Sequence, residues 1–169
     1  MNPDTCKILL PVDGSPDALA AVRHALQRCG APPGASFVLV NVQGPPSLYE
    51  VVVAHDAERI EAVRRDAGID LLVAAEALLE AAGVDYETEV ASGAAEHLIV
   101  ELAENYRCDA IVMGARGVGA PADEGGLGPV ALAVLQASPV PVTIVRAATA
   151  AERDDADKGA SDETGEADA

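Results

Sequence analysis

The residues best suited to chemistry lie in a glycine-rich segment that runs from Gly114 to Gly128. An apolar run at 110–113 precedes this segment, and another at 130–135 follows it. A strand, a glycine-rich loop and a helix in this order direct backbone N–H groups and a helix N-terminus toward an anion. Glycine also lets the backbone approach a ligand without a Cβ in the way. Taken alone, the segment indicates a nucleotide or phosphate site and a ligand-free surface loop equally.

Other chemistry has less support in the sequence. The three histidines, His24, His55 and His97, are far apart and lack Cys or acidic partners at ligand spacing, so we expect no metal site. Ser15 has no His or Asp pattern that would make it a nucleophile, and it is better placed as a helix N-cap. A Gly-x-x-x-x-Gly-Lys loop is absent, which excludes a P-loop hydrolase. We therefore expect a binding protein with no catalytic residues.

The composition of the chain limits the kinds of molecule that it is expected to bind. The chain of 169 residues has a formal net charge of −17 and only 2% aromatic residues. Such a chain repels phosphate backbones and anionic membranes and has little with which to stack on bases, so we expect no nucleic-acid binding and no membrane insertion. Cys6, Cys29 and Cys108 show no metal-ligand or C-x-x-C spacing, which favours a reducing, cytoplasmic location. We expect Cys6 and Cys108 to be core or core-edge residues.

The elements that must position the glycine-rich segment alternate along the chain. Apolar or alternating runs predict strands, and segments with helical periodicity follow each of the first four. Residues 48–53 are compatible with a short helix or a strand, and Gly68 marks a potential interruption of the long second helix. We expect strands at 6–12, 36–42, 85–90, 110–113 and 142–145, the fourth being central, and helices at 16–28, 56–82, 94–106 and 129–137.

This alternation predicts an open α/β sheet of parallel strands with right-handed crossovers. Residues 1–147 form one domain in this interpretation. Residues 148–169 are acid-rich and poor in large apolar side chains, so we expect a disordered tail.

Several segments resemble the universal stress protein (UspA-like) family. They span residues 7–146 and occur in the family's order. The resemblance implies a three-layer, open, twisted five-stranded parallel sheet with helices on both faces, the adenine nucleotide alpha hydrolase-like fold. It also implies a homodimer that pairs through the last strand, Val142–Val145. The segments include Ile8-Leu-Leu-Pro-Val-Asp-Gly-Ser15, Asp109-Ala-Ile-Val-Met-Gly-Ala-Arg-Gly117 and Ser138-Pro-Val-Pro-Val-Thr-Ile-Val-Arg146.

ATP-binding members of the family carry Gly-x-x-Gly, nine residues, and then Gly followed by Ser or Thr. Here Gly114-Ala-Arg-Gly117 matches, but ten residues separate Gly117 from Gly128, and Pro129 replaces the hydroxyl residue. Proline has no N–H, and a lost charge-assisted hydrogen bond costs roughly 1.5–3 kcal/mol. Asp123 and Glu124 add like charge in the same loop, which Arg116 partly offsets. We therefore expect weakened triphosphate binding and rate retained ATP or AMP binding as the less favoured outcome.

If an adenine nucleotide binds, the resemblance assigns residues to its parts. Asp13 would accept a hydrogen bond from a ribose hydroxyl or a loop N–H, and a purely structural brace is an equal alternative. Met113 is more often a core residue than a ligand contact. The expected contacts are Pro11, Val12, Asp13 and Val42 around adenine and ribose, Met113, Gly114 and Gly117 along ribose and phosphates, and Gly128, Val130 and Ala131 at the phosphate end.

Three functions remain open from the sequence. The favoured one is a dimeric, stress-associated regulatory or interaction protein with a degenerate adenine-nucleotide pocket and an unidentified protein partner. The alternative is a functional ATP- or AMP-binding regulatory module. A slow ATP hydrolase is weaker, because no general base or metal-binding carboxylate pair is evident.

Overall fold

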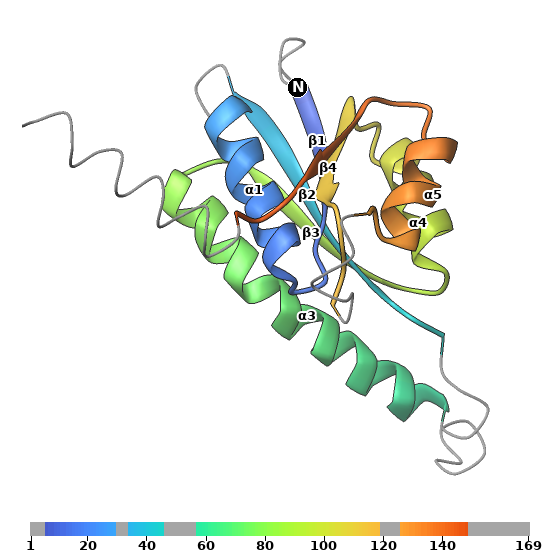
Figure 1. Cartoon of the computed structure of the whole chain (residues 1–169). Helices are drawn as coiled ribbons and strands as arrows, with labels where there is room; N and C mark the ends of the chain where they lie inside the picture. The colour runs from blue at the N-terminus through green and yellow to red at the C-terminus, as the bar shows by residue number, and fades with distance from the viewer. Residues whose placement is uncertain (1–5, 30–33, 46–56, 119–125, 149–169) are drawn as a thin grey trace, which may run out of the picture.

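Parallel strands form a single sheet in the computed structural model, which describes residues 6–29, 34–45, 57–118 and 126–148. The sheet has five strands in the order β3-β2-β1-β4-β5 (Figure 1). This confirms the predicted fold class. The strands are β1 (Cys6–Pro11), β2 (Ala35–Gln43), β3 (Tyr86–Ser92), β4 (Ala110–Gly114) and β5 (Val142–Val145).

The central strand is β1, and the expectation that the strand at 110–113 would be central is wrong. The chain runs outward from β1 to β2 and β3, then returns across the sheet to add β4 and β5 on the other side of β1. Both β1 and β4 are buried in their middle residues. Hydrophobicity alone therefore could not show which of the two strands lies at the centre of the sheet.

The helices cover both faces of the sheet. Figure 1 shows α1 (Pro16–Cys29) and α3 (Ala57–Ala82) on one face, and α4 (Ala95–Asn105) and α5 (Pro129–Ala137) on the other. Right-handed crossovers between parallel strands produce this division. Each predicted helix is confirmed to within one or two residues of its expected ends where the structure describes them.

Alternate residues of each strand pack into two separate hydrophobic cores, one on each face of the sheet. Ile8, Leu10 and Phe37 point to the face under α1 and α3. Leu9 and Val38 point to the face under α4 and α5. Because both faces are covered, the strands read as continuous apolar runs.

Gly68 does not interrupt α3, contrary to the sequence-based suspicion. A Cβ at this position would lie 2.6 Å from Val90 Cγ1 and 2.9 Å from Asn41 Oδ1. The glycine therefore allows the helix to lie directly on β2 and β3. Its role is close packing, which no helix-breaking rule anticipates.

The cysteines divide between surface and core. Cys108 is buried as expected, but Cys6 is exposed, because it is the first residue of β1 and burial begins only two residues further on. Several other predictions concern residues outside the described ranges, namely the element at 48–53, His55, Asp123, Glu124 and the acidic tail from 149.

Candidate functional site

A cavity of about 600 Å³ opens at the carboxyl ends of β1 and β4. These neighbouring strands lead the chain to opposite sides of the sheet, since β1 continues to β2 and β4 continues to β5. In open α/β sheets such a switch in strand order leaves a crevice in which ligands bind. The cavity is therefore where the topology alone would place a binding site.

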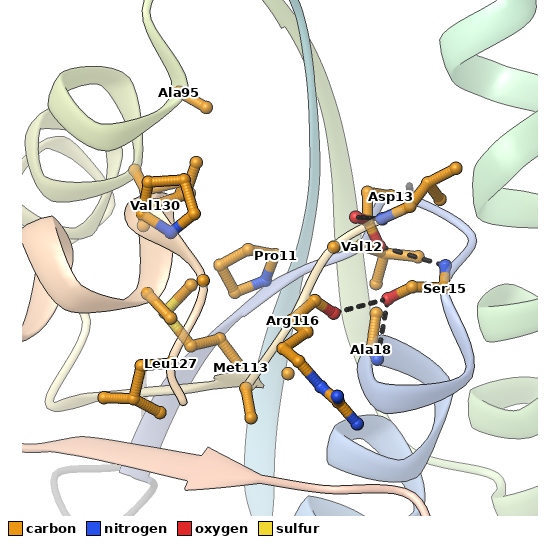
Figure 2. A pocket seen from close by; sticks show the side chains of 18 of the residues that line it. Pro11, Val12, Asp13, Ser15, Ala18, Ala95, Met113, Arg116, Leu127 and Val130 are labelled. Carbon is orange, nitrogen blue, oxygen red and sulfur yellow. Dashed lines mark hydrogen bonds between the residues drawn. The ribbon is translucent and has the colours of Figure 1, made fainter. Parts of the chain in front are cut away.

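Every residue that the sequence analysis assigned to a nucleotide lines this cavity. The ends of β1 and β2, the first turn after β1, the end of β4 and the start of α5 each contribute part of the wall (Figure 2). The structure thus brings together residues from opposite ends of the chain, namely Pro11, Val12, Asp13, Val42, Met113, Gly114, Gly117, Gly128, Val130 and Ala131.

Sequence reasoning missed a further part of the wall. Ala95 and Ile99 lie one helical turn apart on α4, and Val40 lies on the same face of β2 as Val42. Periodicity along α4 and β2 was the available signal, but it could not show which apolar residues face a cavity. The remaining additions are Ser15, Ala18, Ala115, Val118, Gly126 and Leu127, and the cavity is also lined by Arg116 and Pro129, which the sequence analysis weighed for their effect on phosphate binding.

Asp13 braces the wall. Its Oδ2 accepts the N–H of Val118 at 2.9 Å, and its Oδ1 accepts the N–H of Ser15 at 3.0 Å. A Cβ on Gly117 would lie 2.6 Å from Oδ2, so a glycine is needed beside this carboxylate. Each carboxylate oxygen has a second lone pair, so the brace leaves Asp13 able to accept from a ligand.

Ser15 joins the start of α1 to the glycine-rich loop. Its hydroxyl accepts the N–H of Ala18 at 3.2 Å, which confirms the predicted N-cap. The same hydroxyl donates to the carbonyl of Arg116 at 3.2 Å (Figure 2). The loop is therefore held from two positions of one turn, Asp13 and Ser15.

Gly114 permits the closest approach between β4 and α1. A Cβ at this position would lie 2.7 Å from Ala18 N and 2.8 Å from Asp17 C, both backbone atoms. The first glycine of the Gly-x-x-Gly motif thus has a packing role that does not depend on any ligand.

Several backbone positions at the end of the cavity beside α5 have no N–H to offer a ligand, or already use it within the protein. Gly128 donates its N–H to the carbonyl of Ala115 at 2.8 Å, and Pro129, the first helical residue of α5, has no N–H. Val118 donates to Asp13. The first backbone donors of α5 are therefore those of Val130 and Ala131.

Asp17 and Arg116 form the charged pair nearest the cavity. Asp17 Oδ2 lies 3.7 Å from Arg116 Nε, and Oδ1 accepts the N–H of Ala147 at 2.8 Å. Among the described residues that line the cavity, Asp13 and Arg116 are the only charged ones. The remaining walls are mainly apolar, which suits the flat ring of a base more than a hydrated ion.

Tyr106 and Cys108, whose pKa values are shifted, lie just before β4, away from the carboxyl ends of the strands where the cavity opens. The hydrogen bond to Glu89, burial, and the charges of Glu89 and Glu87 raise the pKa of Tyr106 to about 12. Burial raises the pKa of Cys108 to about 11. Within the described ranges, no three His, Cys, Asp or Glu side chains gather as a metal site would require. No described helix is both long and apolar enough to cross a membrane.

Comparison with known proteins gives consistent matches. A family model described as the universal stress protein family matches residues 6–146. Universal stress protein MJ0531 of Methanocaldococcus jannaschii is 29% identical over 140 residues, which cover 83% of this chain and 81% of that protein.

Solved structures share the fold. The hypothetical protein MJ0577 has a TM-score of 0.74 at 23% identity, with 86% of this chain and 98% of that chain covered. A universal stress protein crystallised in complex with cAMP has a TM-score of 0.63 at 27% identity, with 85% of this chain and 98% of that chain covered.

Proposed function

Because the chain belongs to the universal stress protein family, we propose that it is a stress-associated regulatory protein that acts by binding. Its cavity takes the adenosine part of a nucleotide, and its affinity does not rise from AMP to ATP. In this proposal the pocket is degenerate in its binding of the triphosphate, as the sequence favours, but it still recognises adenosine.

The position and lining of the cavity carry the proposal. A volume of about 600 Å³ suits a ligand of nucleotide size, and the walls near Pro11, Val40 and Met113 are apolar. Asp13 offers acceptor capacity at the mouth, where a ribose hydroxyl can donate. The universal stress protein with cAMP supports an adenosine ligand that has a single phosphate.

Three features weaken the hold on further phosphates. Pro129 has no N–H, and the N–H groups of Gly128 and Val118 already donate within the protein. The Arg116 guanidinium is paired with Asp17. Each missing charge-assisted hydrogen bond costs roughly 1.5–3 kcal/mol, or about one to two decades of affinity.

Binding rather than turnover is favoured by the few charged groups at the site. Hydrolysis of ATP requires groups that orient water and stabilise the charge of the transferring phosphate. The described lining offers one braced carboxylate and one paired arginine for this work. No observation favours the hydrolase alternative, whereas a nucleotide-free scaffold is a defined outcome of the test below.

Isothermal titration with adenosine, AMP, cAMP and ATP tests the proposal. We expect adenosine and AMP to bind and ATP to bind no more tightly than AMP. Pro129→Ser restores one backbone donor and one hydroxyl, so it should strengthen ATP binding about tenfold while leaving adenosine unchanged. An absence of heat with every ligand would favour the scaffold, and ATP binding tenfold tighter than AMP in the unaltered protein would contradict the loop argument.

We also propose a homodimer that pairs through β5. This strand lies at the edge of the sheet, so one row of its N–H and C=O groups has no strand partner among the described residues. On α5, Ala131 and Val134 face the sheet, and Val130 lines the cavity toward α4. Successive helical residues turn by about 100°, which puts Leu132 and Leu135 on the flank away from α4.

Leu132 and Leu135 are 45% and 46% exposed and extend the apolar surface beside the β5 edge. Replacing both by Glu should convert a dimer to a monomer in analytical ultracentrifugation. Val63→Glu is the matched control, since Val63 is also an exposed apolar side chain but lies on α3. A monomeric unaltered chain, or a double variant that remains dimeric, would contradict this placement. We place the protein in the cytoplasm, in keeping with its free cysteines.

A further inference from the structure

Arg116 is the only cationic residue among the described residues that line the cavity, yet its side chain extends toward α1. In Figure 2 the side chain extends toward the start of α1 and away from Val130 and Leu127. Its Nε lies 3.7 Å from Asp17 Oδ2, in the first turn of α1. The backbone of Arg116 therefore belongs to the cavity wall, while its charge is directed elsewhere.

Asp17 is well placed to keep that charge. It is a carboxylate with only 7% of its surface exposed, in the first turn of α1, where the helix N-terminus favours a negative charge. Its Oδ1 accepts the N–H of Ala147 at 2.8 Å, which fixes the carboxylate against the chain leaving β5. Its Oδ2 is buried and accepts no hydrogen bond within the described residues.

The unsatisfied oxygen makes the pair hard to open. A buried carboxylate whose oxygen has no hydrogen-bond donor depends on a nearby cation for compensation. For Asp17 Oδ2 the ion pair with Arg116 supplies that compensation. A phosphate in the cavity could recruit Arg116 only by drawing its charge away from the buried Oδ2 of Asp17.

We propose that Asp17 is a specificity-determining residue, which withholds Arg116 from the cavity and so prevents the protein from distinguishing AMP from adenosine by charge. This inference rests on the proposed function, because it concerns the same cavity. It names a cause of weak phosphate recognition, Asp17, that lies outside the glycine motif. A single substitution at this position should reverse the effect.

The main test is the ratio of affinities for AMP and adenosine in Asp17→Asn. The amide retains an oxygen that can accept from Ala147, but it no longer attracts Arg116. We expect AMP to bind about tenfold more tightly, with adenosine changed less than twofold. The double variant Asp17→Asn with Arg116→Gln should lose this gain. Asp66→Asn, on the exposed side of α3, is the matched control for removing one negative charge.

Equal changes for the two ligands, or no gain for AMP, would overturn the inference while leaving the proposed function intact. If neither ligand binds, the proposed function fails, and the chemical shift of the Arg116 Nε–H, assigned by its loss in Arg116→Gln, decides the inference. It should differ between the unaltered protein and Asp17→Asn, because the nearby carboxylate charge is removed, and equal shifts would overturn the withholding of Arg116.

If Asp17→Asn does not fold, the same Nε–H resonance is followed in the unaltered protein. Saturation with AMP should leave it in the position seen with adenosine. A shift caused by AMP alone would show that Arg116 already contacts phosphate, which would overturn the inference.

Discussion

The carboxylate of Asp13 accepts the backbone N–H of Val118 at 2.9 Å, although the two residues are 105 positions apart. This bond joins the turn after β1 to the glycine-rich loop after β4. The other oxygen of Asp13 accepts from Ser15 within its own turn. One side chain thereby fixes the relative position of the two segments that form the cavity mouth.

Asp13→Asn should loosen that mouth. Asparagine has one acceptor oxygen, so either Ser15 or Val118 is left facing an amide group that cannot accept. We expect the free energy of unfolding to fall by about 1–2 kcal/mol and the Val118 amide to exchange faster. Urea denaturation and hydrogen exchange measure the two effects. Asp66→Asn is the control, and unchanged exchange at Val118 would mean that the loop does not depend on Asp13.

Gly114→Ala should disrupt the contact between β4 and α1. The added Cβ would lie within 2.8 Å of backbone atoms of Asp17 and Ala18, which cannot rotate away as a side chain can. We expect a loss of about 2–3 kcal/mol in the free energy of unfolding by urea denaturation. Gly44→Ala provides the comparison, because a Cβ there meets nothing within 4 Å. Similar costs for the two variants would refute the packing explanation.

Arg107→Gly should stabilise the protein. Arg107 has φ 54° and follows the C-cap of α4, where its N–H donates to Glu104 and the next N–H, of Cys108, donates to Ala103. This is the Schellman end of a helix, at which glycine avoids a steric cost. We expect a gain of about 0.5–1 kcal/mol in thermal or urea unfolding. Arg107→Ala keeps the strain, so a gain of the same size there would point to the charge instead.

Tyr106 should make stability depend on alkaline pH. Its pKa is raised to about 12, chiefly by the hydrogen bond to Glu89. The folded state therefore favours the protonated phenol, and this contribution is complete below pH 10 and lost as the pH rises toward 12. Tyrosinate absorbance should show an ionisation near pH 12 that Tyr106→Phe removes. Retention of that step in the variant would assign it to another tyrosine.

The strands, the helices and the location of the cavity could be predicted from the sequence. Runs such as Ile8-Leu-Leu reveal strands buried on both faces, and the carboxyl ends of parallel strands necessarily meet at one edge. Gly114 and Gly117 then mark the loop at that edge. These features depend on local sequence, so they can be predicted without knowledge of how the layers pack.

The parts that could not be predicted depend on distant pairs. Nothing local connects Asp17 with Ala147, 130 residues away, or shows that Gly68 lies against Asn41 and Val90. The central position of β1 follows from the order in which strands join the sheet, which buried strands of similar composition do not encode. In each of these cases the deciding contact forms only after the layers have assembled.

Pro129 occupies a place in α5 where the missing N–H would have had no partner inside the helix. Exchanging it for serine therefore alters what a bound molecule meets while the melting temperature stays nearly constant. At Pro129, unlike at Asp13, ligand preference can therefore change while thermal stability stays the same.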